Sequence, residues 1–265
     1  MDAAGGKLRE ITPADVYIYE YDWAPDSKHL VMTAAKGNGD NNWYVAELYS
    51  ADLASAQLKE LYKPKLQIGR PVVSADGKSV AFIEGLMSDE DSVGGDVFVI
   101  AREGGAARNL TPRRKASAHL LAWTRNGKLV DMEDIEGESS VIRIDPASGG
   151  VEPLYRAPEL LTNGFWATSL SLTREGTSTA CIRTSYAAPP EVWAGPIGKW
   201  KQVTRKNAGL KPAWGEARSV HWKNGGLDVQ GWLIYPEDFD ASKRYPMVVD
   251  AVSYTHLTLP TIYSV

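Results

Sequence analysis

The chain has 265 residues, a formal net charge of −4 at pH 7 and a single cysteine, Cys181. This charge gives no support for a nucleic-acid or anionic-membrane partner. One cysteine excludes an internal disulfide and a metal–thiolate cluster. No stretch approaches the roughly 18 uncharged apolar residues of a membrane-spanning helix. We expect a soluble protein with one large all-β domain or two smaller domains. No signal peptide follows Met1, and a cytoplasmic or a periplasmic location in a bacterium both remain open.

A strand, a tight turn and a second strand recur four times along the chain, at residues 21–32, 71–82, 121–130 and 170–181. The turn residues are 50, 50 and 49 positions apart, and they are Asp26, Asp76, Asn126 and Glu175. Asp-Gly and Asn-Gly between alternating apolar residues are strong hairpin signals, because glycine and asparagine accept positive φ at low cost. A fixed period of this length indicates a repeat architecture.

A second marker recurs with nearly the same period. Five similar segments with an apolar residue near the end lie at 8–12, 58–62, 107–111, 151–155 and 199–204. Each period therefore contains two hairpins, or about four strands, which is typical of a β-propeller blade. The predicted blades run over about 15–64, 65–113, 115–157 and 158–206. Residues 43–49 and 97–100 are expected to be strands within them.

Two acidic clusters fall in the middle of the second and third predicted blades. The first contains Glu84, Asp89, Glu90, Asp91 and Asp96, and the second contains Asp131, Glu133, Asp134, Glu136 and Glu138. Clustered carboxylates can bind calcium, but neither cluster has the spacing of a known calcium loop. We expect both clusters to be solvated.

Three further reactive side chains are expected to be structural. Cys181 lies within a predicted strand with no cationic neighbour, so we expect a small buried side chain and not a reactive thiol. His29 and His119 each lie beside a strand without a second ligand at metal-binding spacing.

The repeat pattern stops after Gly209. Residues 219–222 and 229–235 predict a hairpin around Lys223-Asn224-Gly225-Gly226. Residues 245–250 form an apolar segment after a polar loop, of the kind found as a buried strand in an α/β sheet. We therefore expect a partial propeller over 1–211 and the start of a second domain over 212–250.

These segments together resemble the prolyl oligopeptidase family of serine peptidases, in its dipeptidyl-aminopeptidase and acylaminoacyl-peptidase branch. The segments 23–26 and 74–78 are similar to the propeller repeats of that family. The segment 229–236 followed by 243–249 resembles the first hairpin and first core strand of its α/β-hydrolase domain. The resemblance implies an all-β partial propeller of about four blades, followed by the first strands of an α/β hydrolase.

The resemblance implies a peptide substrate for the parent protein, but it carries no catalytic residue over to this chain. The family continues from the core strand into a His-Gly-Gly-Pro turn, where this chain has Ala251-Val252-Ser253-Tyr254. No Gly-x-Ser-x-Gly elbow occurs, and the Asp and His of such a triad follow the serine. No Glu-Glu dipeptide occurs that could bind a substrate amino terminus. We therefore expect no catalytic, cofactor-binding or metal-binding residue, no cofactor and no activity in this chain alone.

Both ends of the sequence suggest a fragment. Residues 2–12 read as the tail of a blade whose head is missing. Residues 251–265 resemble a translated sequencing-library adaptor, so Ser253 and His256 would have no catalytic meaning. The oligomeric state stays open.

Two other functions remain open. A propeller without a catalytic domain could recognise a partner through its loops, although such a protein does not need residues 219–250. A propeller glycosidase would need two carboxylates at a matched separation, which the sequence cannot show.

Overall fold

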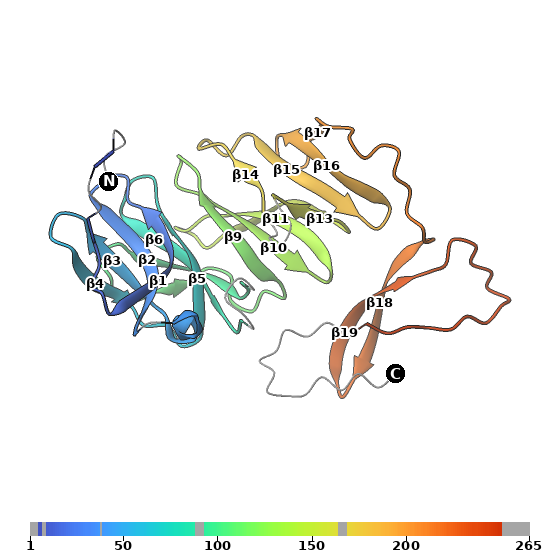
Figure 1. The fold of residues 1–265 in the computed structure, drawn as a ribbon, viewed down its shortest axis with the longest axis horizontal. Helices are drawn as coiled ribbons and strands as arrows, with labels where there is room; N and C mark the ends of the chain where they lie inside the picture. The colour runs from blue at the N-terminus through green and yellow to red at the C-terminus, as the bar shows by residue number, and fades with distance from the viewer. Residues whose placement is uncertain (1–4, 7–8, 38, 88–92, 164–168, 251–265) are drawn as a thin grey trace.

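The computed structural model describes residues 5–6, 9–37, 39–87, 93–163 and 169–250. These residues form four successive antiparallel sheets, which we call blades 1 to 4, and a separate hairpin (Figure 1). The predicted adaptor segment, the acidic residues 89–91 and the residues 2–4 and 7–8 of the predicted blade tail lie outside the described residues. No described helix is long and apolar enough to cross a membrane.

The first three blades each contain four strands in sequence order. Blade 1 consists of β1 (Val16–Trp23), β2 (His29–Lys36), β3 (Glu47–Asp52) and β4 (Gln57–Tyr62). Blade 2 consists of β5 (Gln67–Val73), β6 (Ser79–Gly85), β7 (Asp96–Ala101) and β8 (Arg108–Asn109). Blade 3 consists of β9 (Ser117–Trp123), β10 (Leu129–Ile135), β11 (Glu138–Ile144) and β12 (Val151–Ala157). The propeller repeat predicted from the sequence is confirmed.

Blade 4 differs in its first strand, which is divided into two short pieces that both pair with the second strand. It consists of β13 (Leu160–Thr162), β14 (Ser171–Leu172), β15 (Thr179–Ser185), β16 (Ala188–Gly195) and β17 (Lys201–Gln202). The hairpin of β18 (Ala217–Asn224) and β19 (Leu227–Ile234) follows blade 4.

The recurring turn has the same geometry in all four blades. Gly77, Gly127 and Gly176 have φ values of +71°, +75° and +71°, and Ser27 takes the same position in blade 1 with φ 56°. The aspartate before this position caps the turn, since Asp26 Oδ1 accepts the backbone N–H of Lys28 at 2.8 Å. Local side-chain-to-backbone bonds of this kind explain why Asp and Asn recur there.

The core lies between successive blades. Val31 and Leu48 of blade 1 pack with Val80 and Phe82 of blade 2 in one buried cluster. Two further clusters join blade 2 to blade 3 and blade 3 to blade 4. Each sheet thus buries apolar side chains on a face that the next sheet covers, which is how packed sheets form a core.

A charged side chain holds each linker between blades. Glu84 of β6 accepts the N–H groups of linker residues 65 and 66 at 2.8 and 3.2 Å. Glu133 of β10 binds Arg114 of the next linker, and Arg183 of β15 binds Glu159 of the last one at 3.0 Å. The blades are therefore fixed to one another by polar contacts as well as by the apolar clusters.

Two predictions from the sequence are wrong in detail. Residues 43–45 belong to the 3-10 helix η1 (Asp40–Val45), and the strand begins only at Glu47. The helix turns Trp43 inward, where it is 6% exposed. Residues 245–250 form no strand, because no described strand lies beside them to supply hydrogen bonds.

Candidate functional site

One face of the propeller meets the β18–β19 hairpin. We call it the junction face, and it is formed by the connections between second and third strands at residues 39–46, 135–138 and 185–188. Gly137 lies in one of these connections with φ +77°, and a Cβ there would lie 2.9 Å from the indole nitrogen of Trp232. Trp214 donates its indole N–H to the carbonyl of Tyr186 at 3.0 Å. The hairpin segment is therefore seated on blades 3 and 4.

A cavity of about 460 Å³, which we call the junction pocket, lies between these two blades and the hairpin segment. Tyr186, Trp214 and Trp232 form its aromatic wall, with the rings of Tyr186 and Trp232 5.3 Å apart. Asp134, Glu138 and Glu159 bring three carboxylates to the lining, which contains no lysine, arginine or histidine. The volume lies within the range of small-ligand sites.

Each carboxylate of the junction pocket has a partner outside the lining. Asp134 lies 3.0 Å from Nε2 of His119. Glu138 binds the guanidinium group of Arg156, which also binds Glu136 at 3.0 Å.

The carboxylate of Glu159 accepts hydrogen bonds from Nε of Arg183 and from the hydroxyl of Tyr155. Burial and this carboxylate raise the pKa of Tyr155 to about 12, so the hydroxyl remains a hydrogen-bond donor at neutral pH.

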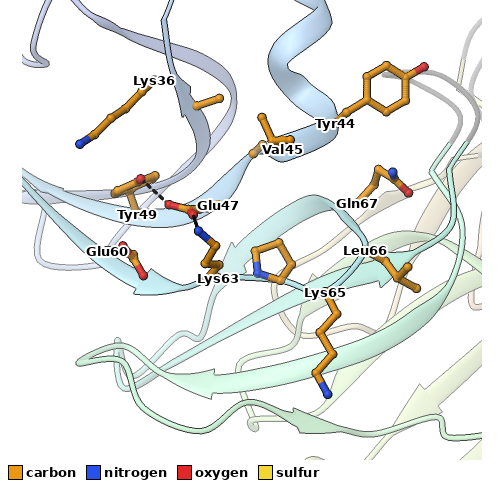
Figure 2. A pocket seen from close by; sticks show the side chains of 13 residues that line it. Lys36, Tyr44, Val45, Glu47, Tyr49, Glu60, Lys63, Lys65, Leu66 and Gln67 are labelled. Atoms are coloured by element: carbon orange, nitrogen blue, oxygen red, sulfur yellow. Dashed lines mark hydrogen bonds and ion pairs between the residues drawn. The ribbon is translucent and has the colours of Figure 1, made fainter.

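A second cavity of about 650 Å³ opens on the junction face between η1 and the linker that joins blades 1 and 2 (Figure 2). Glu47 accepts the hydroxyl of Tyr49 at 2.6 Å and Nζ of Lys63 at 3.0 Å. The Tyr49 hydrogen bond is the main cause that lowers the pKa of Glu47. Figure 2 shows the amino group of Lys63 beside Glu47, whose pKa is also lowered by the charges of Lys63 and Lys36. The charges of this cavity therefore act mainly on one another.

The second acidic cluster is only partly solvated, so the expectation for it is wrong. Asp131 and Glu133 lie on β10 and are each 1% exposed. Arg114 binds both oxygens of Glu133, and Ser140 donates to one of them at 3.0 Å. Oδ1 of Asp131 has no hydrogen-bond partner. Burial, and then the nearby Glu133, raise the pKa of Asp131 well above its usual range.

The expectation is also wrong for Glu84 of the first acidic cluster, which is buried and holds the linker between blades 1 and 2. Asp96 accepts the side-chain amide of Asn109 at 2.7 Å. Within the described parts of both clusters and the rest of the described chain, no three or more His, Cys, Asp or Glu side chains come together as a possible metal site.

The three described histidines, His29, His119 and His221, lie in ion-pair or hydrogen-bond contacts near the surface. His29 lies between Asp26 and Asp52, at 2.9 and 3.4 Å. Ser219 Oγ and His221 Nε2 are 3.4 Å apart on β18, a contact that the sequence reading missed. In the described chain no carboxylate contacts the ring of His221, and both side chains are exposed. The pair therefore lacks the orienting acid of a serine-hydrolase triad.

Cys181 is 4% exposed, as expected. Burial raises the pKa of its thiol to about 11, which keeps the thiol protonated and unreactive at neutral pH.

The sequence reading also missed the aromatic wall of the junction pocket. Tyr186, Trp214 and Trp232 are far apart in the sequence and follow no shared spacing. The sequence contains several tryptophans after residue 209, where the repeat pattern stops. This enrichment does not show which side chains Trp214 and Trp232 contact.

No family model matches the chain. A probable dipeptidyl-peptidase 5 of Emericella nidulans is 27% identical over 191 residues, which are 67% of this chain and 25% of that protein. A dipeptidyl-peptidase 5 of Porphyromonas gingivalis is 21% identical over 245 residues, which are 88% of this chain and 34% of that protein. The chain thus spans about a quarter to a third of the length of these relatives.

Among solved structures, a putative dipeptidyl aminopeptidase IV from Bacteroides ovatus has a TM-score of 0.60 at 15% identity, covering 88% of this chain and 36% of that one. This similarity supports the fold. The sequence relatives, the repeated four-stranded blades and the hairpin that follows them together support a peptidase of the prolyl oligopeptidase family.

Proposed function

We propose that residues 1–211 are part of the substrate-gating propeller of a serine-type peptidase, and that residues 212–250 begin its α/β-hydrolase domain. The catalytic triad lies outside these residues, so this chain alone does not cleave peptides. The observation that carries the proposal is the β18–β19 hairpin with the apolar segment that follows it.

The exposure of that segment supports the division into two domains. Met247, Val248 and Val249 are 73%, 91% and 76% exposed. Three consecutive exposed apolar residues are rare in a folded domain unless another surface covers them. Trp222 and Leu227 of the hairpin are also exposed, at 50% and 72%. A hydrolase sheet would cover these side chains.

The sequence supports the absence of a triad within the chain, since it contains no Gly-x-Ser-x-Gly elbow. In the parent protein a serine would attack the peptide carbonyl, a histidine would transfer the proton and an aspartate would orient the histidine. Backbone N–H groups would stabilise the oxyanion.

The contribution of this chain is access to that centre. The blades form a rigid wall, because apolar clusters and charged linkers join each blade to the next. A wall of this kind admits short or unstructured peptides and excludes folded proteins. The junction pocket lies where the propeller meets the β18–β19 hairpin.

A propeller that binds a partner without catalysis is the alternative. The repeated turns fit both functions equally well. The hairpin and the exposed apolar segment favour the peptidase, because a propeller alone has no use for them.

The test compares two proteins. The source locus is sequenced beyond Asp250, and the extended protein is expressed beside residues 1–265. We expect the extension to encode a Gly-x-Ser-x-Gly elbow with a later Asp and His. The extended protein should hydrolyse aminoacyl reporters in a reaction blocked by a serine-directed inhibitor, and residues 1–265 should not. An extension without these residues, or inhibitor-sensitive turnover by repurified residues 1–265, would overturn the proposal.

A further inference from the structure

We propose that the junction pocket binds the side chain of a lysine or arginine residue in a peptide. The inference rests on the proposed function only in taking the ligand to be a peptide. It assigns a charge preference to a cavity whose walls come from blade 3, blade 4 and the hairpin segment.

The first observation is the charge around the pocket. The lining carries three carboxylates and no cationic side chain. Adding Glu136, which shares Arg156 with Glu138, gives four carboxylates. Two guanidinium groups, those of Arg156 and Arg183, face them. Leaving His119 out of the count, these four carboxylates and two guanidinium groups leave an excess of two negative charges, which a cationic ligand would offset.

The second observation is the aromatic wall. Trp214 is fixed by its hydrogen bond to the Tyr186 carbonyl, and Trp232 lies against both Tyr186 and Gly137. Lysine and arginine have an apolar stem and a charged end. Their stems can pack on these rings while the charged end reaches the carboxylates, and the faces of tryptophan and tyrosine also attract cations. An α-amino group has no such stem.

The chain already holds one of its own arginines in this way. The guanidinium carbon of Arg183 lies 4.5 Å from the ring centre of Trp193 and 5.4 Å from that of Trp200. Its Nε donates to both oxygens of Glu159 at 3.0 Å. Glu159 is also one of the residues that line the junction pocket.

The experiment measures fluorescence anisotropy of labelled peptides with purified residues 1–265. The peptides are acetylated and amidated, so that the side chain is their only cation. They carry lysine, arginine or norleucine at one central position. We expect the lysine and arginine peptides to bind at least tenfold more tightly than the norleucine peptide at low salt, with the difference shrinking as salt is added.

Two variants test the site. Asp134→Asn keeps the Glu138–Arg156 pair intact, and Glu138→Gln leaves Arg156 paired with Glu136. Each should weaken binding of the lysine peptide at least threefold. The control is Glu103→Gln. Glu103 lies in the connection between β7 and β8 of blade 2, outside the lining of the junction pocket, and its side chain is 78% exposed. It should leave binding unchanged.

Equal binding of the norleucine peptide, no saturable binding of any peptide, or unchanged binding in both folded variants would overturn the inference. Tighter binding of an unacetylated norleucine peptide than of the acetylated lysine peptide would also overturn it. The two proposals can fail independently. If the extended protein has no hydrolytic activity, the junction pocket can still bind lysine peptides.

Discussion

Replacing Arg114 with methionine should destabilise the protein strongly, because it removes the main partner of a buried charge. Glu133 is 1% exposed, and Arg114 donates from Nε and Nη2 to its two oxygens. Only the hydroxyl of Ser140 remains as a donor in the variant. Breaking a buried ion pair from one side costs about 3–5 kcal/mol.

Urea unfolding followed by tryptophan fluorescence measures the effect. The control is Arg143→Met in the same blade, where Arg143 and Glu152 are 41% and 60% exposed. Exposed pairs contribute about 0–1 kcal/mol. The double variant Arg114→Met/Glu133→Met should recover most of the lost stability. A loss in Arg114→Met no greater than in the control would refute this reasoning.

Two further substitutions test single contacts. Burial raises the pKa of Asp131, so the folded protein holds a proton that the unfolded chain releases above about pH 4, and stability falls as pH rises. Asp131→Asn removes this dependence, and its gain over the original protein should grow by at most about 1.4 kcal/mol per pH unit; parallel stability curves between pH 5 and 8 would contradict this. Trp123 donates its indole N–H to the Val72 carbonyl at 3.1 Å across blades 2 and 3. Trp123→Phe should cost about 1–2 kcal/mol in urea unfolding, whereas Trp23→Phe at the equivalent, 54% exposed position should change little; equal losses would argue against the contact.

The repeat could be read from the sequence because its cause is local. Each turn needs a residue with positive φ, which glycine supplies at 77, 127 and 176 and Ser27 supplies in blade 1. In blades 1 and 2 the aspartate beside it, Asp26 or Asp76, accepts a hydrogen bond from the turn backbone. These requirements are met within five residues, so they leave a periodic pattern in the chain.

The environment of the acidic residues could not be read in this way. Glu133 and Glu136 are three residues apart in one acidic run, yet the side chain of the first is 1% exposed and that of the second 58%. Their exposures differ because Glu133 lies on β10, between β9 and β11, with its side chain on a covered face of the sheet. Arg114 of the linker, 19 residues earlier in the chain, binds its carboxylate there. The same reasoning applies to residues 245–250. Their apolar character predicts a strand, but a strand also needs a second strand beside it to supply hydrogen bonds.

The sequence by itself determined the four blades, the change of pattern after residue 209 and the family resemblance, because hairpin turns and alternating apolar residues are local. Only the tertiary structure decided which blades bury carboxylates and where the hairpin lies. It also decided that Tyr186, Trp214 and Trp232 enclose one cavity. These features arise from side chains that meet across blades, and such meetings depend on how whole sheets pack and not on the residues beside them in the chain.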